Sequence, residues 1–425
     1  MNETTTQPRT FTLRARSLLT MQGPALENGL ITIHEGWITG INEVDPPEPI
    51  FDLGDVILMP GLVNAHTHLE FSDLSAPLPA GDNFADWIRA VISHRQQQRN
   101  DSSDSNGNST DQVQSIVKQG QRESIQSGVT TIGEISTVPG SQRWYQQSKT
   151  QTVLFQEVLG LGSEIVSDRL QMAQQHLDYR LPKESPLTLG LSPHAPYSMH
   201  HDLFLQTCDL AKQQQVPCAF HLAESREEIE LLKSATGPLQ ETLDSLGVWN
   251  STAISCNRTP LNYLQLLSEL PRSLIIHGNF LTTDEIKFLG EQADRMSLVY
   301  CPRTYSHFQS YPHPVSVMLK HGVNVALGPD SRATNPDLDL LAEMKYVAHA
   351  HPTIAPELIV QMGTSHGACA LGLSNICGTL EPGKRANLIT LRSDSGSAAS
   401  VAESVIAPAS RVQSVMSNGE WLVRP

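Results

Sequence analysis

The stretch PGLVNAHTH at residues 60–68 places His66 and His68 at the end of an apolar run. In an extended segment, residues two apart point to the same side, so the two imidazoles would face one point. Imidazole suits zinc or iron as a ligand. Alone, a His-x-His pair is weak evidence for a metal site, so its meaning depends on whether other ligands occur later in the chain.

After this stretch, short apolar runs alternate with helical sequence, which is the pattern of repeated strand–helix units. The candidate strands lie near residues 56–58, 129–134, 152–157, 187–192, 219–221, 273–277, 297–301 and 323–330. Repeated units of this number predict an α/β fold, a (β/α)8 TIM barrel with insertions. An open doubly wound sheet, which would need fewer strands, is the second choice.

Three more metal-ligand or acid side chains follow candidate strands. They are His221, His277 and Asp330. The C-terminal ends of all barrel strands converge on one mouth, so these groups would meet His66 and His68 there. One such residue alone is usually structural, but five at predicted strand ends are hard to explain in that way.

With these residues the sequence resembles the amidohydrolase superfamily, and within it the cytosine deaminase/chlorohydrolase-like branch. The matching motifs are PGLVNAHTH, SGVTTIGE, SPHAPYS, HLAES, IIHG, CPRTYSHF and LGPDSRATNPDLDLLAEM. The tail GTLEPGKRANL resembles the C-terminal β segment of that family. Three motifs, HTHLEFS, SPHAPYS and CPRTYSHF, are most similar to the aminodeoxyfutalosine deaminases of an alternative menaquinone pathway.

The resemblance implies one divalent metal ion per chain, Zn²⁺ or alternatively Fe²⁺, with His66, His68, His221 and Asp330 as ligands. Such a metal lowers the pKa of a bound water from about 15.7 to roughly 7, which supplies hydroxide at neutral pH. Asp330 would also accept the proton of the water. Glu224 would protonate a ring nitrogen and then the departing amine, and His277 would orient the hydroxide. On its neighbours alone, Glu224 would be a solvated residue at a helix start.

The resemblance implies less about the substrate. His194 and Tyr197 correspond to substrate-facing positions, although two prolines in the same motif could instead fix a simple turn. Arg303, or alternatively Arg332, could bind a substrate carboxylate with its planar fork, while a surface ion pair is the commoner role of an arginine.

Three further residues could line the pocket through ribose contacts or stacking. They are Glu70, Phe71 and Trp87.

The predicted function is hydrolytic deamination of an aminated purine nucleoside similar to aminodeoxyfutalosine, with release of ammonia. The alternatives are a deaminase of S-adenosylhomocysteine, methylthioadenosine or another nucleobase, and a triazine-type chlorohydrolase. From a different class, a non-catalytic scaffold could have kept the fold. Metal content would separate the scaffold from the enzymes.

The β-rich ends, residues 1–57 and 378–425, predict one small sandwich-like β domain, and residues 58–377 predict the barrel. The segment 96–114 has almost no apolar residue and predicts a mobile surface insertion. The net charge of −15 argues against nucleic acid or an anionic membrane as partner. Six cysteines without CxxC spacing and no apolar leader predict a cytoplasmic enzyme with a small-molecule substrate. A homodimer is an option that the sequence leaves open.

Overall fold

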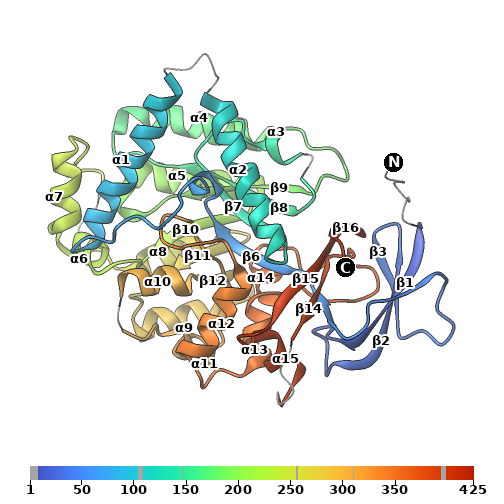
Figure 1. The fold of residues 1–425 in the computed structure, drawn as a ribbon. Coiled ribbons are helices and arrows are strands. Elements are labelled where there is room, and N and C mark those ends of the chain that lie inside the picture. Colours follow the sequence, from blue (N-terminus) through green and yellow to red (C-terminus); the bar gives the residue numbers. More distant parts are fainter. Residues whose placement is uncertain (1–7, 104–108, 147, 255–256, 310, 394–398) are drawn as a thin grey trace.

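The computed structural model describes residues 8–425 except 104–108, 147, 255–256, 310 and 394–398. Its centre is a sheet of eight parallel strands that follow one another in chain order, with helices around them (Figure 1). A bridge between Thr67 and Asp330 joins the first strand to the segment after the last, which closes the barrel. The strands are β6 (Leu62–Thr67), β7 (Val129–Ser136), β8 (Gln151–Val158), β9 (Leu187–Pro193), β10 (Cys218–Leu222), β11 (Ser273–His277), β12 (Met296–Tyr300) and β13 (Asn324–Leu327).

The barrel strands are apolar because helices cover their outer side and other strands face their inner side. In β10 and β11, for example, every residue is buried, as expected for parallel strands buried on both faces. Val153 and Phe155 of β8 pack inside the barrel with Ala219 and Ile276 from across the sheet. These contacts define which face of each strand looks into the barrel.

The helices fill the connections between strands and extend to the C-terminal region. The α-helices are α1 (Phe84–Ser103), α2 (Ser109–Gln126), α3 (Gln142–Tyr145), α4 (Val166–Leu177), α5 (His201–Gln214), α6 (Arg226–Ser234), α7 (Pro238–Ser245), α8 (Pro260–Leu267), α9 (Thr283–Glu291), α10 (Pro302–Phe308), α11 (Val315–Lys320), α12 (Leu340–Ala350), α13 (Pro356–Met362), α14 (Ser365–Ala370) and α15 (Val401–Ile406). Short 3₁₀ helices are η1 (Leu69–Phe71), η2 (Ser163–Ile165) and η3 (Pro196–Ser198). Among the described residues, no helix is both long and apolar enough to cross a membrane.

A second sheet, of mixed direction, is built from both ends of the chain, as predicted. In Figure 1 the blue N-terminal strands and the red C-terminal strands lie side by side. Its order is β16-β15-β14-β5-β1-β2-β3, and β4 pairs with β1. The strands are β1 (Thr10–Leu18), β2 (Leu26–His34), β3 (Trp37–Ile41), β4 (Ile50–Asp52), β5 (Ile57–Pro60), β14 (Leu388–Arg392), β15 (Arg411–Ser417) and β16 (Glu420–Val423). The exact bounds of the two domains stay a prediction.

One expectation from the sequence is wrong. The segment 56–58 is not the first barrel strand, because β5 pairs with β1 and β14 of the terminal sheet and the barrel begins with β6. Both strands are fully buried and follow each other closely, so the apolar residues at their start could not assign them to different sheets. The segment 96–114 lies between the first two barrel strands, as predicted, and α1 and α2 extend through most of it. Its residues 104–108 lie outside the described chain, and its mobility stays a prediction. Its glutamines are good helix formers.

Candidate metal and catalytic site

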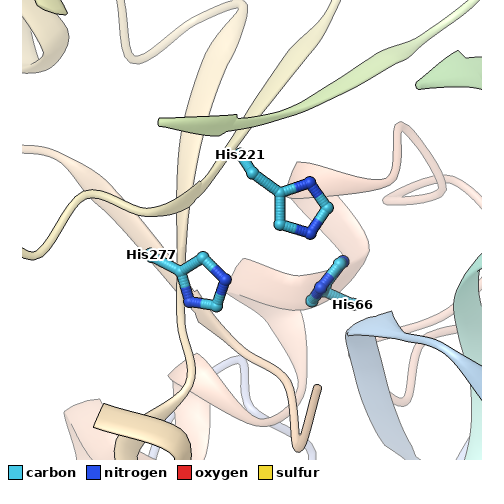
Figure 2. Close-up of side chains that lie close together, drawn as sticks. All are labelled: His66, His221 and His277. Atoms are coloured by element: carbon cyan, nitrogen blue, oxygen red, sulfur yellow. The ribbon is translucent and has the colours of Figure 1, made fainter. Parts of the chain in front are cut away.

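Five of the predicted side chains meet at the C-terminal mouth of the barrel. His66 and His68 come from the end of β6, His221 from β10, His277 from the end of β11, and Asp330 follows β13. The ligand atoms of His66, His221 and His277 lie within 4.8 Å of one another, and so do those of His66, His68 and Asp330. Figure 2 shows the rings of His66, His221 and His277 pointing toward one another. Strand ends far apart in the sequence therefore form one cluster, as predicted.

The two ends of the barrel wall hold Asp330 in a fixed orientation. Its carbonyl oxygen accepts hydrogen bonds from the His68 amide at 2.8 Å and the Thr67 hydroxyl at 2.7 Å. Its Oδ2 accepts from the hydroxyls of Thr304 at 3.3 Å and Thr334 at 3.2 Å. Its Oδ1 lies 3.5 Å from His66 Nε2 and 3.8 Å from His68 Nε2. One carboxylate oxygen is thus held by hydroxyls, and the other faces the imidazoles.

The backbone at two of these positions adopts the left-handed conformation. His277 has φ of 71° and Asp330 has φ of 59°. Residues other than glycine seldom adopt this region, which costs on the order of 1 kcal/mol or more, and such conformations gather at functional sites. Here the turn at each strand end aims the side chain at the cluster.

The cluster has the protonation states that a metal site needs. Burial, and then the nearby His66, hold the pKa values of His68 and His221 well below the ordinary value for histidine. Burial opposes ionisation of Asp330, but the nearby imidazoles of His66, His277 and His68 lower the pKa of Asp330 below its usual value. Neutral imidazoles next to an ionised carboxylate are the ligand forms that a divalent cation binds.

His66 provides a direct test of whether a metal fits. The residue is fully buried, yet neither of its ring nitrogens has a hydrogen-bond partner among the described residues. The Nε2 atoms of His68 and His221 lie only 3.3 Å apart. Buried polar atoms without partners are rare, and a set of three imidazoles and a carboxylate suits zinc. The residues present therefore fit a single divalent metal.

Glu224 lies beside this cluster and is buried, so it is not a solvated residue at a helix start. Its Oε1 lies 3.4 Å from His277 Nε2. The Glu228 carboxylate accepts hydrogen bonds from the amides of Ala223 at 2.8 Å and Glu224 at 2.9 Å, which holds the turn before α6. Burial, and then the charges of Asp330 and Glu228, raise the pKa of Glu224 well above its ordinary value. A carboxyl group that keeps its proton near neutral pH can act as a general acid.

His194 and Tyr197 also lie at the mouth. The His194 ring is 5.0 Å from that of His221 and 5.7 Å from that of Tyr197. Burial lowers the pKa of His194 to about 4, so its imidazole is neutral. Tyr197 is buried, and its hydroxyl partly offsets the rise in the pKa of Glu224. Both side chains therefore lie beside the cluster.

The two arginines predicted to bind a carboxylate are engaged within the protein. Arg303 pairs with Glu343 at 2.5 Å and with Asp337 at 2.7 Å. Arg332 pairs with Glu123 at 2.9 Å and also donates to a backbone carbonyl. The sequence could not reveal these partners, because each lies far away along the chain.

The remaining predicted residues form one side of the mouth. The Glu70 carboxylate accepts hydrogen bonds from Ser136 and the Thr137 amide at 2.9 and 2.8 Å, so it is held by the end of β7. Trp87 stacks on Phe84, with ring centroids 5.4 Å apart, and donates to a backbone carbonyl. Phe71 lies under the Arg95 guanidinium, 4.7 Å from ring centroid to Cζ.

Sequence reasoning missed two charged residues at the mouth, Arg95 and Glu157. Arg95 pairs with Glu70 at 3.4 Å, and its positive charge lowers the pKa values of His68 and His194 further. Glu157 ends β8, and its Oε1 lies 3.8 Å from His194 Nε2. Its position at a strand end was a usable signal, but no motif drew attention to it. Arg95 lies within a helix, where only the fold brings it to the site.

Known proteins resemble this chain over most of its length. The amidohydrolase family profile matches residues 57–422. The chain is 29% identical over 394 residues to a 5-methylthioadenosine/S-adenosylhomocysteine deaminase of Moorella thermoacetica, an alignment that covers 88% of this chain and 83% of that protein.

Solved structures share the fold. A Helicobacter pylori aminofutalosine deaminase in complex with methylthio-coformycin has a TM-score of 0.82 and 23% identity, covering 97% of this chain and 100% of that one. A zinc-bound adenosine deaminase of Xanthomonas campestris has a TM-score of 0.78 and 21% identity, covering 97% of this chain and 92% of that one. The motifs, the barrel and the family match agree, and the chain belongs to the amidohydrolase family, hydrolases that act on carbon–nitrogen bonds.

Proposed function

We propose that this protein deaminates an aminated purine nucleoside by hydrolysis and releases ammonia. The observation that carries the proposal is the buried Glu224 carboxyl group, which lies 3.4 Å from His277 beside the histidine–aspartate cluster. Hydrolytic deamination of a ring needs a proton donor for a ring nitrogen next to the site where water is activated. The resemblance to a methylthioadenosine/S-adenosylhomocysteine deaminase supports the nucleoside as the substrate class.

His66, His68, His221 and Asp330 would hold one divalent metal, for which we propose Zn²⁺. The zinc in the similar Xanthomonas protein supports this choice over Fe²⁺. When bound, the metal would supply Lewis-acid activation of water at neutral pH.

The protein's own groups would carry the protons. Glu224 would donate its proton to a ring nitrogen, which makes the carbon that bears the amino group more electrophilic. It would then take up one proton of the attacking water and pass it to the leaving amino group, which departs as ammonia, and the other proton of the water would restore the protonated Glu224. Asp330, ionised because of its imidazole neighbours, would accept this other proton first. Burial lowers the pKa of His277 to about 4, so its neutral imidazole would position the water and Glu224 by hydrogen bonding.

The wall of the mouth supports a nucleoside with an aromatic or thioether group at the 5′ position. Phe84, Trp87, Tyr197 and Phe308 form a connected aromatic cluster, and Trp87 and Phe308 are partly exposed. Aromatic faces bind flat or thioether groups. Among such nucleosides, the motifs of the sequence put aminodeoxyfutalosine first and methylthioadenosine or S-adenosylhomocysteine next.

The test is ammonia release by purified protein whose metal content has been measured. The panel is aminodeoxyfutalosine, S-adenosylhomocysteine, methylthioadenosine, adenosine, guanine, cytosine and a chlorotriazine. Turnover of a purine nucleoside with one zinc per chain is the expected result. Reaction of only cytosine or the chlorotriazine would overturn the nucleoside assignment, and absence of both metal and turnover would favour a non-catalytic scaffold.

A further inference from the structure

A cavity lies at the N-terminal end of the barrel, opposite the metal cluster. It has a volume of about 330 Å³, which falls within the range of small-molecule pockets. The N-terminal ends of β9, β10 and β11 and the turn after α14 surround it. The five residues of β10 span roughly 16 Å, so this cavity is a place separate from the metal cluster at the other end of the strands.

Much of the cavity surface is apolar. Leu371 and Leu373 line the cavity and also pack with the apolar residues inside the barrel, so they close the barrel at this end. Pro217 and Pro271, which precede β10 and β11, line it as well. A ligand that fills this space must therefore have an apolar body.

Arg272 brings a positive charge to this apolar cavity without an acidic partner. Its Nη1 donates to the backbone carbonyl of Cys369 at 2.6 Å, and it forms no ion pair within the described part of the chain. Arg303 and Arg332, in contrast, are both paired with carboxylates. Because a neutral carbonyl uses one of the five N–H groups of Arg272, the charge and the remaining donors are left for a ligand.

Gly372 makes room for this guanidinium. A Cβ atom on Gly372 would lie 3.0 Å from Arg272 Nε and 3.2 Å from Arg272 Cδ. The φ of Gly372 is 74°, in the left-handed region that favours glycine. The turn after α14 thus lies directly against the arginine side chain, and together with the Cys369 carbonyl it holds the planar fork at the cavity.

We propose that this cavity binds a small organic carboxylate, which Arg272 recognises. The fork of an arginine matches the two oxygens of a carboxylate, and one cation without a partner suits one negative charge. The apolar floor favours an organic acid over inorganic phosphate. Asn375 lines the cavity and forms no hydrogen bond with the described residues, so its amide is free to bind the same ligand.

The site is independent of the proposed deaminase function. Side chains at the N-terminal end of a barrel contribute to stability, whereas the opposite end carries the chemistry. A ligand that binds only the folded protein stabilises it by mass action. Binding of the carboxylate should therefore raise the temperature of unfolding and leave the chemistry at the metal cluster unchanged.

The experiment measures binding of benzoate and of its neutral analogue benzamide to the full-length, zinc-loaded protein by ligand-observed NMR. For a ligand of this size we expect a Kd for benzoate of about 1 mM in the wild type. Benzamide should bind about 10-fold more weakly or less, because it lacks the charge. The temperature of unfolding should rise with benzoate concentration and not with benzamide.

Two variants locate the bound benzoate. Arg272→Gln keeps a donor for the Cys369 carbonyl and removes the charge, so it should weaken benzoate binding by about 10- to 100-fold. Asn375→Trp adds a large side chain at an exposed position of the lining and should block the cavity while Arg272 stays in place. Arg295→Gln is the matched control, because this exposed arginine precedes β12 at the same end of the barrel and should bind benzoate as the wild type does.

Weaker binding in both variants, with wild-type binding in Arg295→Gln, is the expected result. Equal affinities of the wild type, Arg272→Gln and Asn375→Trp would mean that benzoate binds elsewhere, for example at the metal cluster, and would overturn the proposal. Equal affinities for benzoate and benzamide would overturn the choice of a carboxylate. If thermal unfolding shows that Arg272→Gln is not folded, Asn375→Trp alone decides, and none of these measurements depends on turnover of a nucleoside.

Discussion

Glu224 differs from the other carboxylates of the mouth in its surroundings. Asp330 faces imidazoles, Glu70 accepts hydrogen bonds from the end of β7, and Glu224 is buried next to other acids. Asp330 and Glu224 have the same chemistry, yet the pKa of Asp330 is lowered and that of Glu224 is raised. We expect Glu224→Gln to keep the metal and lose turnover by about 10²- to 10⁴-fold, the usual contribution of a general acid.

Metal analysis and the initial rate of ammonia release measure this expectation. Glu230→Gln, at an exposed position on α6, is the matched control and should remain active. Wild-type activity of Glu224→Gln would show that another group carries the proton.

Arg303 is expected to act on stability and not on substrate binding. It is the partner of Glu343, whose side chain is fully buried, at 2.5 Å. Removing one member of a buried pair leaves the other charge without compensation, at a cost of about 3–5 kcal/mol. Arg303→Met should therefore lower the free energy of unfolding by this amount, measured by denaturant titration, and the double variant with Glu343→Leu should recover part of it. An unchanged stability with a raised KM for a substrate that carries a carboxylate would instead support the role in substrate binding.

At this scale the sequence predicted the members of the cluster and missed groups that only the fold brings together. His66, His221 and Asp330 each follow an apolar run, and the barrel brings the ends of such runs together at one mouth. The pairing of Arg303 with Glu343 depends on the packing of α10 against α12, which no pattern in the sequence records. Glu157 also lies at the end of a barrel strand, but it was missed because it is not part of a recognised sequence motif.

Among the elements, β6 and β13 must approach closely for the site to exist. A Cβ atom on Gly328 would lie 2.5 Å from the backbone oxygen of His66. That contact is with backbone and cannot be relieved by a rotamer change. Gly328→Ala should therefore separate the strand that carries His66 from the turn that carries Asp330, and so weaken metal binding.

Competition with a chelator of known affinity measures the change in metal affinity. Gly23→Ala is the matched control, because nothing lies within 4 Å of the Cβ position there. Equal zinc affinities of Gly328→Ala and the wild type would mean that the strands can shift without disturbing the ligands.

The elements also mark the limit of sequence-based prediction. The seven later barrel strands were found at their observed places, because turns and helical sequence separate them. The first was misplaced because β5 and β6 are separated by Gly61 alone, and both are fully buried. The close contact that a Cβ atom on Gly61 would make with the Thr130 side chain shows why glycine stands between the two sheets.

For the whole molecule, buried histidines make the folded state sensitive to acid. His176 on α4 is 2% exposed and lies outside the site, and burial lowers its pKa to about 4 from 6.5. The unfolded chain binds this proton first as pH falls, so stability is complete above about pH 6.5 and decreases down to about pH 4. The expected loss from this one group between pH 7 and pH 5 is about 2 kcal/mol.

Denaturant unfolding of the wild type and of His176→Gln at these two pH values measures that loss. The other titrating groups are the same in both proteins, so the variant should lose less stability by about the stated amount. Equal losses would mean that His176 takes up a proton without unfolding.

The bridge between Thr67 and Asp330 has a consequence for biosynthesis. The first two ligands leave the ribosome early, while Asp330 and the last barrel strand emerge more than half a chain later. The terminal sheet likewise waits for β14, which pairs with β5. Neither sheet can be completed as the chain emerges, so most of the polypeptide must remain unfolded until synthesis is nearly finished. A chain that terminates before Asp330 would lack both the carboxylate ligand and the contact that joins the first and last strands of the barrel.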